Sequence, residues 1–129
     1  MTGVPITLLY AGILGLLAAG LANQVLWARI NAKNLPDWKP DITMRVQANF
    51  VENVPLALIM LYLLEEASAP GVIVHVLGAA LVLGRLAHAW GYSTNPGATY
   101  ARLIGAQATF ILIAVMGTGG IYYALAAGA

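Results

Sequence analysis

The sequence predicts an all-α membrane protein, built as a four-helix up-down bundle, and three observations support that prediction. Of its 129 residues, 60% are hydrophobic, and the mean hydropathy is +0.81. Only 9% are charged, against roughly 25% in an ordinary soluble domain. Four long apolar stretches alternate with short polar segments. So few polar side chains cannot cover a water-facing surface, which excludes a soluble globular protein. A disordered chain is excluded because it needs low hydrophobicity and high charge.

Each apolar stretch is long enough to cross a bilayer, which takes about 20 residues. We expect the helices at residues 6–28, 42–64, 72–92 and 99–127, forming a single transmembrane domain over residues 1–129. The segment between the first two stretches is polar and contains two prolines, so we expect a solvated loop there. The turn at Glu65 and Glu66 is also expected to be solvated. Short connections make consecutive helices antiparallel neighbours.

The basic residues predict how the bundle is oriented. The first polar loop holds Arg29, Lys33 and Lys39, whereas the 65–71 turn and both ends of the chain hold no lysine or arginine. The positive-inside rule therefore places this loop in the cytoplasm and the termini outside. A net charge of +1 gives no reason to expect nucleic acid as a partner. The absence of cysteine excludes disulfides, thiolate metal sites and a cysteine nucleophile, and we expect no metal.

Polar residues inside the second apolar stretch share one helix face. Arg45, Asn49 and Glu52 are spaced i, i+4, i+7, and Gln47 and Asn53 lie on neighbouring faces. A charge at the centre of a spanning helix costs about 2.5 to 3.5 kcal/mol. Such residues are therefore expected to face a protein interior and to find partners there.

A second polar face is predicted on the third helix, where Arg85, His88 and Tyr92 are spaced i, i+3, i+7. Glu52 and Arg85 both lie roughly 10 Å from the same membrane side, at 1.5 Å rise per residue. We expect them to meet at one level, with Asn49 and His88 meeting one turn nearer the cytoplasm. The mouth of this polar cleft is expected to be ringed by Arg45, Tyr92 and Arg102.

A purely structural interpretation of these residues is also open. Glu52 and Arg85 would then form a structural ion pair, and Arg45 and Arg102 would extend to lipid headgroups. The number of polar residues on matched faces favours a site over a single pair. His75 has no polar neighbour at helical spacing and is expected to be structural or exposed.

These residues give the chain a resemblance to a known family. One motif holds Arg45, Gln47, Asn49, Glu52 and Pro55, and another holds Arg85, His88, Gly91 and Tyr92, followed by Arg102. With this pattern the sequence resembles the MAPEG family, the membrane-associated proteins in eicosanoid and glutathione metabolism. Because it lacks long loops, it is most similar to small bacterial members. The resemblance covers nearly the whole chain.

The resemblance implies a homotrimer in the bacterial inner membrane, with glutathione as co-substrate bound between subunits near the cytoplasmic side. By position, Arg102 would stabilise the glutathione thiolate. The residues implied to bind glutathione are Arg29, Arg45, Gln47, Asn49, Glu52, Arg85, His88 and Tyr92. The second partner would be a lipophilic electrophile or a lipid held in the membrane.

The activity itself is left with alternatives. Asn53 and Leu103 depart from the eicosanoid synthases of this family, so the electrophile stays open, as does transferase against peroxidase activity. One alternative is a non-catalytic lipid- or partner-binding protein of the same fold. Another is a small multidrug or proton-coupled transporter, but such transporters carry a glutamate in the first helix, and the 6–28 stretch has no charge.

Overall fold

Four long helices form an up-down bundle in the computed structural model, which describes residues 3–94 and 100–129, with side chains described for 3–91 and 100–129. The elements are α1 (Ile6–Ile30), a short 3-10 helix (Ala32–Asn34), α2 (Trp38–Glu66), α3 (Gly71–Thr94) and α4 (Tyr100–Ala126). All four long helices are apolar and long enough to cross a membrane. Helices suit this solvent because a lipid-exposed backbone must satisfy its hydrogen bonds within its own segment. The predicted fold class is confirmed.

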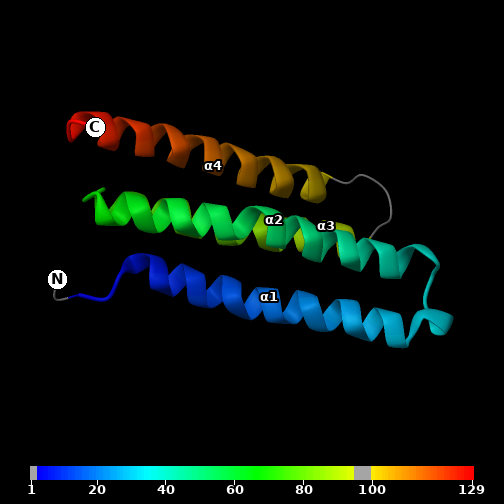
Figure 1. Ribbon diagram of the computed structural model, residues 1–129. Coiled ribbons are helices and arrows are strands. Elements are labelled where there is room, and N and C mark those ends of the chain that lie inside the picture. The colour runs from blue at the N-terminus through cyan, green and yellow to red at the C-terminus, as the bar shows by residue number, and fades with distance from the viewer. Residues whose placement is uncertain (1–2, 95–99) are drawn as a thin grey trace.

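The helices are arranged so that α2 and α3 separate α1 from α4 (Figure 1). α1 begins and α4 ends at the same end of the bundle, which we call the terminal end. The opposite end carries the connection between α1 and α2, and we call it the loop end. The terminal end also holds the turn between α2 and α3.

The start of α2 differs from the prediction. The helix begins at Trp38, four residues before the expected boundary, and Pro40 lies in its first turn. Proline is tolerated there because the first backbone N–H groups of a helix have no intrahelical acceptor. The Thr43 hydroxyl donates to the Pro40 carbonyl over 2.8 Å, which supports this turn. The predicted polar loop is therefore shorter than expected and contains the 3-10 helix.

The core of the bundle is organised around α2. Its buried side chains recur every three or four residues and form one apolar stripe facing the other helices. The stripe includes Val46, Phe50, Val54, Ala57, Leu61 and Leu64. Leu14 and Leu21 of α1, Leu81 of α3 and Met116 of α4 pack into the same core.

Glycine brings α3 and α4 into backbone contact. A Cβ atom added at Gly105 would lie 2.6 Å from both the Gly84 carbonyl oxygen and the His88 backbone nitrogen. No side chain fits there without separating the helices. At Gly84 the same addition would meet the Ala108 Cβ atom at 3.4 Å, an ordinary contact. This crossing places α4 directly against the His88 backbone.

Glu65 caps α1 at the terminal end, contrary to the expectation that the Glu65 side chain is solvated. Its half-buried carboxylate accepts hydrogen bonds from the backbone N–H groups of Ile6 and Thr7, the latter at 2.8 Å. The Thr7 hydroxyl also donates to it, at 2.6 Å. Pro5, which precedes α1, makes no side-chain cap. A carboxylate from the end of α2 therefore caps α1, whereas Glu66 is exposed as expected.

Tyr10 and His75 join α1 to α3 at the same end. The Tyr10 hydroxyl lies 2.8 Å from the Nδ1 atom of His75, within hydrogen-bond distance. The Tyr10 ring rests on Gly78, where an added Cβ atom would come within 2.3 Å of the ring. His75 is exposed and bound to a neighbouring helix, so its expected structural or exposed place is confirmed.

Candidate functional site

A buried polar cluster lies where α2, α3 and α4 meet. Arg85 is 1% exposed, and His88 and Thr109 are fully buried. The Arg85 Nη1 atom donates to the Thr109 Oγ1 atom over 3.3 Å, and its Nη2 atom lies 3.3 Å from His88 Nδ1. The guanidinium also lies 5.8 Å from the centre of the Phe50 ring on α2. Three helices thus hold one buried guanidinium in place.

Arg102 adds a second cation to this region. It lies in the first turn of α4 and is partly exposed. The first turn of a helix also presents free N–H groups and the positive end of the helix dipole. Arg85 and His88 are thus in contact on α3, whereas the expected ring of Arg45, Tyr92 and Arg102 at the mouth stays a prediction.

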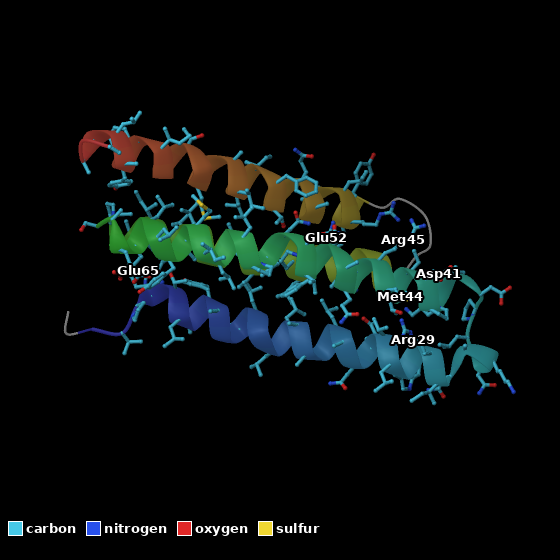
Figure 2. The ribbon with its side chains drawn as sticks, viewed as in Figure 1. Arg29, Asp41, Met44, Arg45, Glu52 and Glu65 are labelled. Carbon is cyan, nitrogen blue, oxygen red and sulfur yellow. The ribbon has the colours of Figure 1, made fainter. Side chains whose placement is uncertain are left out.

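The α2 polar face, which consists of Arg45, Asn49 and Glu52, lies beside this cluster, and its two charged residues are exposed on the single chain. Arg45 and Glu52 are exposed, and Figure 2 shows both on the side of α2 away from α1. The Asn49 side-chain oxygen is buried and has no hydrogen-bond partner among the residues that the structure describes. Exposed charges within a membrane span are costly. A further surface or a ligand is needed to satisfy this face.

The expected meeting of Glu52 and Arg85 is correct for their level along the bundle and wrong for their pairing. The depth is confirmed, because Arg85 lies against Phe50, two residues before Glu52. The pairing is wrong, because Glu52 is exposed whereas Arg85 is buried between the helices. Phe50 belongs to the buried stripe of α2, and the polar face is rotated away from that stripe.

The remaining predicted residues lie around the two polar groups. Gln47 is half-buried on α2 and is not part of the polar face. The Asn53 side chain donates to the Asn49 carbonyl over 2.8 Å. Arg29 is exposed near the loop end and contacts the Met44 sulfur at 3.8 Å (Figure 2). The side chain of Tyr92 lies outside the described residues.

Comparison with known proteins identifies the family. The family model described as the MAPEG family matches residues 6–122.

The chain belongs to the MAPEG family.

With four apolar helices it is an integral membrane protein of that family. The inner membrane protein YecN of Escherichia coli K12 is 35% identical over 49 residues, which is 38% of this chain and 37% of YecN. YecN of Escherichia coli O6:H1 matches to the same extent. The match thus spans little more than a third of these relatives, and no solved structure matches significantly.

Sequence reasoning missed part of the polar cluster in this MAPEG chain. Thr109 binds Arg85, and Gly105 brings α4 against His88. A threonine in an apolar helix is unremarkable, since its hydroxyl bonds the preceding turn. The available signal is spacing: Arg102, Gly105 and Thr109 are related by i, i+3, i+7, as are the predicted residues on α3.

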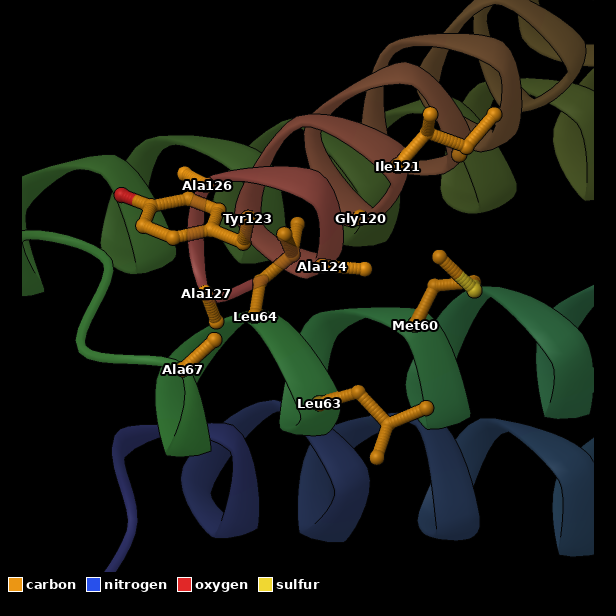
Figure 3. Close-up of a pocket in the computed structure, with 11 residues that line it drawn as sticks. Met60, Leu63, Leu64, Ala67, Gly120, Ile121, Tyr123, Ala124, Ala126 and Ala127 are labelled. Carbon is orange, nitrogen blue, oxygen red and sulfur yellow. The ribbon is translucent and has the colours of Figure 1, made fainter. Parts of the chain in front are cut away.

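An apolar groove lies at the terminal end of the MAPEG bundle, between the C-terminal turns of α2 and α4 (Figure 3). This groove has a volume of about 770 Å³ and is apolar. Small residues on α4 open it, among them Gly117 and Gly120. Its walls are Met60, Leu63, Leu64, Ala67, Gly117, Gly120, Ile121, Tyr123, Ala124, Ala126 and Ala127. None of these carries a charge, so the groove offers apolar contact rather than chemistry.

Proposed function

We propose that this protein is an integral membrane glutathione transferase that activates the glutathione thiolate for attack on a lipophilic electrophile. Reduction of lipid hydroperoxides with the same thiol is the related activity to test. The single observation that supports the proposal most strongly is the α2 polar face, whose charges Arg45 and Glu52 are exposed at membrane depth near the buried Arg85 of α3. MAPEG membership supports glutathione as the ligand.

The charges on this face complement glutathione, which carries two carboxylates, one ammonium group and one thiol. Arginine binds carboxylate through a two-pronged hydrogen-bonded fork, a role proposed for Arg45. Glu52 offers a carboxylate for the ammonium group. Asn49, which is half-buried, is proposed to pair its side-chain amide with a peptide group of the ligand. Gln47, Arg85, His88 and Tyr92 are proposed to line the same site.

The proposed site is completed by further copies of the chain. A lone subunit leaves Arg45 and Glu52 exposed within its membrane span, at a cost of several kcal/mol, about 2.5 to 3.5 per charge. In the proposed homotrimer, a neighbouring copy covers the α2 polar face, and the Arg29 side chain of that copy helps to bind the ligand. The proposed location is the bacterial inner membrane, with the site facing the cytoplasm. The basic first loop and the likeness to an inner membrane protein support this.

The chemistry requires an ionised thiol. A free thiol has a pKa of about 8.5, so only a few per cent is thiolate at neutral pH. Stabilising the thiolate by about 2.7 kcal/mol lowers that pKa by two units, which one partly desolvated arginine such as Arg102 supplies. The sulfur electron pair then bonds to the electrophile, the leaving group departs with its bonding pair, and the thiol proton goes to solvent.

A glutathione titration near pH 7 in light buffer tests the proposal, with proton release recorded. The wild-type protein in detergent is expected to bind saturably and to release close to one proton per occupied site. Arg102→Ala should fold, release no proton and lose conjugation, whereas the control Lys33→Ala, on the exposed 3-10 helix, should behave as wild type. Wild-type turnover by Arg102→Ala would refute the role of Arg102. Absence of binding at millimolar glutathione would refute the ligand.

The second candidate function is non-catalytic lipid binding, which the apolar groove at the terminal end favours. A lipid-binding protein would retain lipid through purification and show no turnover with any electrophile. Glutathione binding without proton release would also favour this alternative, because the ligand would then be held but not activated.

A further inference from the structure

Pro55 interrupts the hydrogen-bond ladder of α2 at membrane depth. It lies inside the helix, which continues without a break from Trp38 to Glu66. In an α-helix the N–H of each residue donates to the carbonyl four residues earlier, and proline has no N–H. The Val51 carbonyl oxygen therefore lacks its helical donor. A polar group left unpaired in a membrane-spanning segment costs free energy, so this oxygen needs a donor from elsewhere.

The usual ways of pairing such a carbonyl are not open within this chain. A serine or threonine hydroxyl often takes the place of the missing N–H, but α2 holds neither residue after Thr43. A neighbouring helix could also donate, but Val51 is 59% exposed and Pro55 is exposed as well. The strip of α2 between these two residues carries the oxygen, and the described helices of the same chain leave that strip uncovered.

The free oxygen lies beside the Glu52 side chain. One peptide bond joins Val51 to Glu52, which places the carbonyl oxygen about 3 Å from the Glu52 Cα atom. Glu52 is exposed, and Pro55, three residues later, lies on the same side of the helix. The α2 polar face therefore offers two hydrogen-bond acceptors side by side, a charged carboxylate and a neutral backbone carbonyl.

Two adjacent acceptors of this kind suit a primary ammonium group. An ammonium group has three N–H donors and no acceptor, so one carboxylate does not use all of its donors. The carboxylate supplies the opposite charge, and the carbonyl accepts a further N–H. A guanidinium group, by contrast, fits the two oxygens of a single carboxylate as a fork and needs no added carbonyl. Of the groups on glutathione, the ammonium group is the one that matches.

We propose that the Val51 backbone carbonyl is a further ligand-binding group of the thiol site: with the Glu52 carboxylate, it accepts hydrogen bonds from the ammonium group of glutathione. Pro55 is the positioning residue, since it keeps this oxygen free by lacking an N–H. The identity of the ligand rests on the proposed function. The unpaired oxygen costs free energy in the empty helix and is satisfied in the complex, so the proline favours the bound state.

Carbon-13 NMR reads the Val51 carbonyl directly. Val51 and Glu52 form the only valine–glutamate pair in the sequence, so protein labelled with carbonyl-carbon-13 valine and nitrogen-15 glutamate gives a single correlated signal. A carbonyl carbon moves downfield when its oxygen accepts a hydrogen bond. We expect the wild-type signal in detergent to move downfield on saturation with glutathione. Saturation with glutaryl-cysteinyl-glycine, which lacks only the amino group, should leave the signal in place.

Pro55→Ala restores the missing N–H and tests the same contact by affinity. The helix then pairs the Val51 carbonyl itself, so glutathione should bind about tenfold more weakly, which corresponds to 1.4 kcal/mol. The affinity for glutaryl-cysteinyl-glycine should not change, because that ligand makes no such contact. The matched control is Pro40→Ala in the first turn of α2, where a new N–H has no helical acceptor. Both affinities should stay at the wild-type value in this control.

The outcomes separate this inference from the proposed function. If glutathione binds without moving the Val51 signal, the inference is overturned and the proposed function stands. If Pro55→Ala weakens both ligands equally, the proline acts by bending α2, and the inference is again overturned. If glutathione does not bind to the wild-type protein, the proposed function is refuted and the inference falls with it. If Pro55→Ala does not fold, the wild-type signal with the two ligands decides the inference alone.

Discussion

The two ends of the bundle handle their polar groups in opposite ways. At the terminal end, Glu65 caps α1 through Ile6 and Thr7, and Tyr10 bonds His75, so these groups are satisfied within one chain. Toward the loop end, Arg45 and Glu52 are exposed on α2, and the Asn49 side-chain oxygen has no partner within the described part of the chain. Both ends lie in helices of similar apolar character.

The difference separates polar residues that are satisfied within the fold from those available to a proposed ligand or second subunit. A set that is satisfied internally stabilises the chain and offers nothing to a partner. A set left open within a membrane span costs free energy in the single chain. We therefore propose that the open set toward the loop end is the functional one and that the set satisfied within one chain at the terminal end is structural.

The largest expected effect comes from separating the α3–α4 crossing with Gly105→Ala. Its Cβ atom would meet backbone atoms at 2.6 Å, so the helices must move apart and release the Arg85 cluster. We expect a loss of about 3 kcal/mol in the free energy of unfolding, measured in mixed detergent. The control is Gly117→Ala on the same helix, where an added Cβ meets nothing within 4 Å. Equal stability of the two variants would contradict the backbone contact.

The next effect concerns the terminal end. Glu65→Gln replaces an acceptor-only carboxylate with an amide whose NH₂ group opposes the N–H groups of α1. We expect a loss of about 2 kcal/mol in unfolding free energy, as for hydrogen bonds to charged groups. Glu66→Gln, at the exposed neighbouring position, should lose almost nothing. A Glu65→Gln protein as stable as wild type would contradict the claim that the Glu65 carboxylate stabilises the fold.

The smallest expected effect is a gain in stability at the turn after α2. Ser68 has a φ of 70°, in the left-handed region, and the Ala69 N–H bonds the Leu64 carbonyl over 3.0 Å. Glycine adopts this conformation without steric cost at the end of a helix. Ser68→Gly should therefore raise the unfolding free energy by about 1 kcal/mol, seen as a higher Tm. A lower Tm would mean that the serine side chain stabilises the turn.

In this protein the sequence predicts the level of a residue along the bundle better than the direction in which its side chain points. Helices were predictable because lipid leaves the backbone few alternatives, and each residue adds a fixed 1.5 Å, so Arg85 lies at the expected level. Helix rotation was not predictable, because it depends on tertiary packing such as the contact of Gly105 with α3. Rotation turns Arg85 toward Phe50 and leaves Glu52 outside. The Glu65 cap was missed for a related reason, since it joins residues 58 and 59 positions apart.

The most direct test of the central claim is calorimetric titration of glutathione into two matched variants, Glu52→Gln and Glu65→Gln. Each replaces one carboxylate with an amide, one at the open end and one at the closed end. The functional assignment predicts that Glu52→Gln keeps wild-type stability and loses glutathione affinity at least about tenfold. Glu65→Gln should lose stability and keep the affinity. Unchanged affinity in Glu52→Gln, or a loss confined to Glu65→Gln, would contradict the assignment of the α2 polar face as the glutathione site.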